Sequence, residues 1–261
     1  MNGVRVFLLG GVISYRALFG FLHPAVFIPT LLVAPVFQIL LFAYIGRSAG
    51  VGSDEFYVVG NALHSASLPC LWAMSHAIAG ERFQQTLGYI FASPAPRVPL
   101  FLGRALPVVA NGFLVAAFAF VVGGVILRID VPLASLPSIA LVTAVAALAC
   151  TGLGLVNAAL GLVIRDNSLV SNIIYGFLLV FTGANVAIAE LPGWIGTVSH
   201  GLPLRHAIEA ARRLADGETL GDVGGLVGAE ALVGGVYAVL GFALIRAFEG
   251  LSRRRATLEV V

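Results

Sequence analysis

Lysine is absent from the 261-residue sequence, and all 15 basic residues are arginine. A P-loop needs a lysine on the nucleotide phosphates, so this absence excludes a P-loop ATPase. It also excludes catalysis through a Schiff-base lysine. Charged residues make up only 11% of the chain, and the scattered arginines leave a net charge of +2. No basic stripe for binding nucleic acid is therefore indicated.

Cysteines and catalytic motifs are similarly scarce. Cys70 and Cys150 lie in apolar runs without a CxxC partner, which predicts small buried residues. His64 and His76 differ by about 120° on a helical wheel and lie several turns apart, so a shared metal ion is not expected. The sequence contains no HExxH, no GxSxG and no paired intramembrane aspartate. A metal site and an intramembrane hydrolase are both disfavoured.

Hydrophobic residues make up 59% of the chain, and the mean hydropathy is +0.99. A soluble domain has about 45–50% apolar and about 25% charged residues. Too little polar surface remains to cover a water-soluble globule, so the composition predicts an integral membrane protein. A span needs about 20 apolar residues. The sequence predicts a single all-α transmembrane domain over residues 1–261, with six spans at 24–46, 56–80, 100–127, 136–164, 169–189 and 223–247.

The arginines near the span ends predict the orientation, because cytoplasmic loops carry an excess of them. Ten of the 15 arginines fall on one side of the predicted membrane and five on the other. Both termini are therefore predicted in the cytoplasm, with the protein in the plasma or inner membrane. The segment 1–23 predicts an interfacial helix with Arg5 and Arg16 on one face. A longer, bent first span is the alternative.

Two predicted loops are longer than the others and carry amphipathic patterns. In the inner loop 81–99, residues 81–91 place apolar and polar side chains on opposite faces of a helix. This predicts a short helix across the inner mouth of the bundle, or else an ordinary solvated helix. In the outer segment 190–222, Pro192 and Trp194 follow the fifth span and Pro203 starts a second amphipathic helix. That pattern predicts a re-entrant outer hairpin.

Several polar residues fall within the predicted spans, where polar groups are costly and face a bundle interior or a wet cavity. Asn61 and His64 share one face of the second span, while Asn172 and Asn185 belong to the fifth. These four residues are candidates for lining a substrate path between the two spans. Interhelical hydrogen bonding between packed spans is the alternative.

Two motifs resemble the membrane subunit of a type-2 ABC exporter, the family of drug, antibiotic and polysaccharide permeases. The first is Gly-Glu-Arg at 80–82, Thr-Leu at 86–87 and Ser-Pro at 93–94, with Gln85 where glycine is usual. The second is Leu-Pro-Gly-Trp at 191–194 with Leu-Pro-Leu-Arg-His at 202–206. The residues of this outer motif are Pro192, Trp194, Pro203, His206 and Arg212.

The resemblance implies that the helix at 81–91 is a coupling helix docking on a separate ATP-binding cassette subunit with a P-loop. The coupling residues would be Glu81, Arg82, Gln84, Gln85 and Thr86. ATP and Mg²⁺ would be bound by that partner, with no cofactor in this chain. A second membrane subunit, identical or homologous, would complete the path within membrane lipid.

The function implied is non-enzymatic: ATP-driven export of a lipophilic small molecule, drug or antibiotic by alternating access. The apolar lining favours such a cargo over a polysaccharide, and a polysaccharide or a lipid is the less favoured alternative. An ion-coupled secondary carrier would need ionisable groups at midmembrane, and Glu230 is the only acid within a predicted span. A non-transporting membrane anchor is a further alternative.

Overall fold

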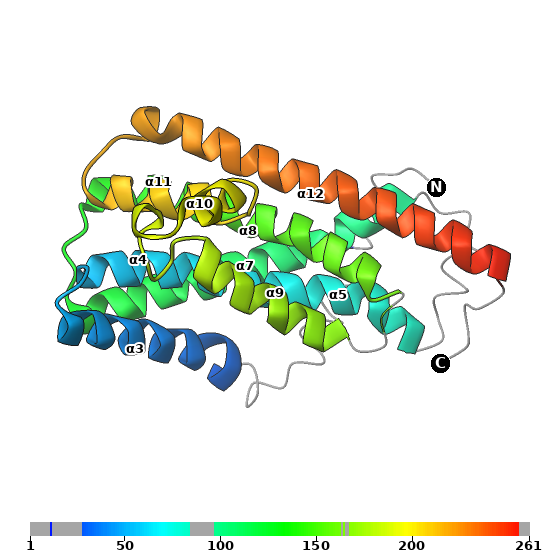
Figure 1. The fold of residues 1–261 in the computed structure, drawn as a ribbon, viewed down its shortest axis with the longest axis horizontal. Coiled ribbons are helices and arrows are strands. Elements are labelled where there is room, and N and C mark those ends of the chain that lie inside the picture. The colour runs from blue at the N-terminus through cyan, green and yellow to red at the C-terminus, as the bar shows by residue number, and fades with distance from the viewer. Residues whose placement is uncertain (1–10, 12–27, 84–96, 163, 165–166, 256–261) are drawn as a thin grey trace.

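The computed structural model describes the chain except residues 1–10, 12–27, 84–96, 163, 165–166 and 256–261. Every regular element in the described part is helical, as predicted, and the long helices lie side by side in one elongated bundle (Figure 1). The elements are η1 (Ile28–Val33), α3 (Ala34–Ala49), α4 (Asp54–Ser65), α5 (Ser67–Phe83), α7 (Arg97–Leu127), η2 (Leu133–Ser135), α8 (Leu136–Leu160), α9 (Asn167–Phe181), η3 (Ile188–Glu190), α10 (Gly193–Ser199), α11 (Arg205–Ala215) and α12 (Leu220–Arg255).

Four helices in the described part are long and apolar enough to cross a membrane. They are Ile28–Ala49, Gly103–Leu127, Leu133–Leu160 and Leu220–Phe248, and they match the first, third, fourth and sixth predicted spans. The connections 50–53, 128–132 and 216–219 lie together at one end of the bundle (Figure 1). We call this the outer end, after the predicted orientation. Six spans in total remain a prediction.

The second predicted span is two helices, because α4 ends at Ser65 and α5 begins at Ser67. Pro69 lacks a backbone N–H and is tolerated only in the first turn of a helix. Near it, the Ser65 hydroxyl donates to the Ala62 carbonyl and the Ser67 hydroxyl to the His64 carbonyl, both at 2.6 Å. These local bonds offer the backbone carbonyls an alternative to the helical ladder, and the helix breaks there.

The prediction for the fifth span, 169–189, was wrong at its outer end. Helix α9 stops at Phe181 and is 15 residues long. Gly183 follows with φ +80°, a left-handed conformation that favours glycine and ends a helix. Asn185 therefore lies in an irregular segment at 182–187 rather than in a span, and the outer segment begins at 182 instead of 190.

The inner loop is also shorter than predicted. Helix α5 continues through Phe83, and α7 begins at Arg97. Glu81 and Arg82 thus belong to the last turn of α5, so a separate helix does not start at residue 81. The rest of the predicted coupling helix, including Gln84, Gln85 and Thr86, lies outside the described residues, as does the interfacial helix except for Gly11.

Helix α8 lies at the centre of the bundle and packs along α12 and α5. Glycine allows the close approach to α12: a Cβ on Gly152 would lie 2.5 Å from the Gly234 carbonyl oxygen. A Cβ on Gly234 would lie 2.6 Å from the Cα of Ala149. Cys150 of α8 and Cys70 of α5 are free and fully buried. Small residues therefore allow these helices to pack closely.

Candidate functional site

The guanidinium of Arg212 joins three segments at the outer end of the bundle. Its Nη1 donates to the Gly183 carbonyl at 2.9 Å. Its Nη2 donates to the carbonyls of Phe56 and Ala184, each at 3.0 Å. The guanidinium also stacks over the Phe56 ring, 3.4 Å from its centroid. One side chain of α11 therefore holds the segment after α9 against the first turn of α4.

Arg212 is a predicted outer-motif residue, and it stays charged although its surroundings disfavour the charge. Burial, followed by the nearby charge of Arg205, lowers the pKa of Arg212 from 12.5 to about 9. This pKa still lies above neutral pH, so the guanidinium donates as a cation. Charge-assisted hydrogen bonds are the strong ones, which suits a side chain that joins three segments.

Gly60 in α4 makes room for this contact. A Cβ at Gly60 would lie 2.3 Å from the Ala184 carbonyl oxygen and 2.6 Å from Nη2 of Arg212. Both distances are shorter than real Cβ contacts allow. The 182–187 segment can therefore lie on α4 only because residue 60 has no side chain.

Glu230 of the neighbouring helix α12 caps the first turn of α11. Its Oε1 accepts from the Leu204 N–H at 2.7 Å, and its Oε2 accepts from the Ala207 N–H at 3.2 Å. The side chain is fully buried. The first N–H groups of a helix lack intrahelical partners, and the helix dipole favours an anion there. The single acid that sequence analysis placed in a span thus binds a helix N-terminus.

The other outer-motif residues surround this cap. The helix begins at Arg205 rather than at Pro203, and Leu204 precedes it with φ +76°. His206 Nδ1 lies 3.9 Å from Glu230 Oε2, and burial lowers the pKa of His206 from 6.5. Pro192 precedes α10, while Trp194 is exposed and its ring lies 5.9 Å from that of Phe181.

A hydrogen-bond network connects α3, α4, α9 and the 182–187 segment. Asn61 Nδ2 donates to Asn185 Oδ1 at 2.8 Å, and Gln38 Nε2 donates to Asn61 Oδ1 at 3.0 Å. The Tyr175 hydroxyl donates to Gln38 Oε1 at 2.8 Å. His64 lies 3.4 Å from Gln38 Nε2 through Nδ1 and 3.3 Å from the Tyr175 carbonyl through Nε2. Three of the four predicted path residues therefore meet in one network.

The structure separates the fourth predicted residue from this network. Asn172 is exposed on α9, next to Ile173, which is 67% exposed. Gln38 and Tyr175 were not among the predicted site residues. Gln38 is an amide inside the first apolar span, and such polar groups indicate an interhelical partner. That pattern could have identified Gln38, although not its partners.

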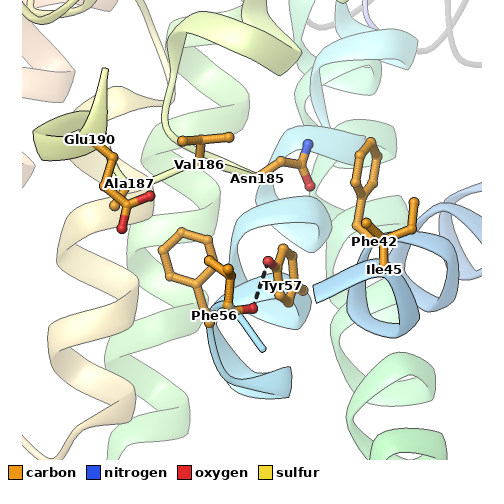
Figure 2. A pocket seen from close by; sticks show the side chains of 10 residues that line it. Phe42, Ile45, Phe56, Tyr57, Asn185, Val186, Ala187 and Glu190 are labelled. Carbon is orange, nitrogen blue, oxygen red and sulfur yellow. Dashed lines mark hydrogen bonds between the residues drawn. The ribbon is translucent and has the colours of Figure 1, made fainter. Parts of the chain in front are cut away.

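A cavity of about 420 Å³ opens beside the network at the outer end. In Figure 2, Phe56 and Tyr57 lie between Glu190 on one side and Phe42 and Ile45 on the other. Asn185 contributes to the wall, so the cavity and the network share a residue. The lining residues are Phe42, Ile45, Val51, Gly52, Phe56, Tyr57, Asn185, Val186, Ala187 and Glu190.

An all-helical bundle with four helices able to cross a membrane, within its described part, is a multi-span membrane protein. The model of the ABC-2 type transporter family matches residues 12–214, and the chain belongs to that family. The match extends from the N-terminal region through α11, and so includes the Arg212 contacts. It confirms the resemblance found in the sequence motifs. No curated protein matches the chain.

Proposed function

We propose that this chain exports a lipophilic small molecule, such as a drug or an antibiotic, as the membrane subunit of an ATP-driven transporter. The family match over residues 12–214 carries the proposal. The sequence has no lysine and hence no P-loop of its own, so ATP hydrolysis belongs to a separate subunit. That ATP-binding cassette subunit would bind ATP and Mg²⁺.

Energy reaches the membrane through the segment from Glu81 to Thr86, which we propose as the contact with the ATPase. Closure of the ATPase subunits moves this segment, and α5 carries the movement towards α4 because the two helices adjoin at Ala66. At the outer end, α4 is bound to α11 through Arg212. Alternating access is then a population shift in which the partner favours the outward-open state.

The cargo path is proposed to lie beside Asn61, His64 and Asn185, where a second membrane subunit would complete it. In the described structure these residues bond to one another and to Gln38 and Tyr175. In this proposal the network closes the path, and outward opening would have to separate α3 from α4 and α9. Asn172 is not part of this proposal, because it lies on the exposed face of α9.

The hydrogen bonds that Glu230 accepts argue against an ion-coupled carrier. Such a carrier needs an ionisable group free to take and release the coupling ion. Both oxygens of Glu230 are already bonded to backbone N–H groups of the α11 start. The acid is thus committed to holding α11.

The test is reconstitution of the chain with its ATPase in vesicles, followed by ATP-dependent export of a lipophilic dye. A Glu81→Ala, Arg82→Ala double variant should lose ATPase retention and export while remaining inserted. Truncating one partner of a buried charge pair costs about 2–5 kcal/mol. An Arg253→Ala, Arg254→Ala variant removes charges from the same predicted side of the membrane. It should retain both the bound ATPase and export. Wild-type coupling in the Glu81, Arg82 variant would contradict the role of this segment.

A further inference from the structure

We propose that the outer cavity beside Glu190 binds an amphipathic organic cation, as the last site that the cargo occupies before release. The inference rests on the proposed export function and names its cargo class. Small-molecule sites are mostly apolar cavities of about 300–1,000 Å³ with a few polar groups. At about 420 Å³, this cavity has room for a drug-sized body.

The walls select an apolar, aromatic-rich ligand. Phe42, Phe56 and Tyr57 present rings to the cavity, and Ile45 and Val186 add aliphatic surface. The Tyr57 hydroxyl already donates to the Val51 carbonyl at 3.0 Å, so this ring contributes mainly its face and edge. A ligand body that covered these side chains would be stabilised because apolar surface is removed from water.

The charge at the cavity selects a cation. Glu190 is exposed at the edge, and none of the lining residues is basic. Within the described part of the chain, the ion pairs join other residues and leave the Glu190 carboxylate unpaired. An anionic ligand would therefore meet repulsion from this carboxylate, and a cationic ligand would meet attraction.

The position of Arg212 indicates at which side of the cavity the cationic group of the ligand lies. Arg212 covers one face of the Phe56 ring, so a second positive charge over Phe56 would be repelled. The ligand cation thus belongs at Glu190, on the opposite side of the cavity from Phe42 and Ile45 (Figure 2). The apolar body would extend from Glu190 past Phe56 and Tyr57 towards α3.

The experiment compares tetraphenylphosphonium with tetraphenylborate, two ions of the same shape and opposite charge. Binding is measured by equilibrium dialysis on the full chain in nanodiscs of neutral lipid, without nucleotide, and the uptake of empty nanodiscs is subtracted. We expect saturable binding of the cation and none of the anion. Glu190→Gln should weaken cation binding by about fivefold, since an exposed ion pair is worth up to about 1 kcal/mol.

The control is Asp130→Asn, which removes an exposed acid that does not line the cavity and should leave the affinity unchanged. Phe42→Ala should weaken binding through lost apolar contact. Saturable binding of the anion, no saturable binding of the cation, or equal cation affinity in Glu190→Gln would overturn the inference. These outcomes do not involve ATP, so export in the reconstituted complex separates a failure of this site from a failure of the proposed function.

Discussion

Glu230 and Leu204 lie 26 positions apart in the sequence, yet the buried carboxylate of Glu230 accepts the Leu204 N–H at 2.7 Å. Leu204 has φ +76°, a conformation that non-glycine residues rarely adopt. Such a backbone persists only where its surroundings hold it. The contact connects α12 to the start of α11 and fixes the residue at which α11 begins. The outer segment is thereby attached to the sixth predicted span.

This relationship predicts unequal effects of two substitutions at Glu230. Glu230→Leu leaves the N–H groups of Leu204 and Ala207 unsatisfied, and each buried unpaired donor costs about 1–3 kcal/mol. Glu230→Gln retains one carbonyl oxygen as an acceptor, so it should destabilise less. The measurement is the thermal unfolding midpoint of the purified protein. Glu218→Gln, at the exposed pair with Arg213, should change the midpoint little. Equal midpoints for the two Glu230 variants would rule out the capping role.

Hydropathy predicted the four long helices because a span needs one continuous apolar run. The break at Ala66 was missed because it depends on Pro69 and on local serine bonds rather than on hydropathy. The early end of α9 was missed for a similar reason, since Gly183 ends the helix within an apolar run.

The residue types of the candidate site could be predicted from the sequence. Which residues contact each other was harder to predict. Asn61, His64 and Arg212 stood out as polar groups in apolar or amphipathic segments. Their partners depend on how each helix is rotated about its axis, which a single sequence does not reveal. Backbone carbonyls are an extreme case, because the acceptors of Arg212 at Gly183 and Ala184 carry no side-chain signal.

Gly60 offers a test of the outer contact between α4 and the 182–187 segment. Gly60→Ala places a Cβ 2.3 Å from the Ala184 carbonyl oxygen, so the segment must move and the Arg212 bonds must lengthen. Overpacking of this kind costs about 1–3 kcal/mol. Gly224→Ala in α12 is the matched control, because its Cβ would meet nothing within 4 Å. Alanine should stabilise that helix by up to about 1 kcal/mol. Thermal unfolding should therefore shift down for Gly60→Ala and stay level or rise for Gly224→Ala.

The last prediction concerns the hydrogen bond between Asn61 and Asn185. If the network closes the path, the two side chains stabilise the closed state jointly, and their effects on stability should not add. A double-mutant cycle with Asn61→Ala and Asn185→Ala should give a coupling free energy of about 1 kcal/mol, typical of an intramolecular hydrogen bond. The control cycle pairs Asn61→Ala with Asn172→Ala, whose exposed side chain lies outside the network, and should be additive within about 0.5 kcal/mol. Denaturant unfolding of the purified variants measures both cycles. Additivity in the first cycle would show that the Asn61–Asn185 bond does not hold α4 to the segment after α9. That bond would then be no barrier to opening.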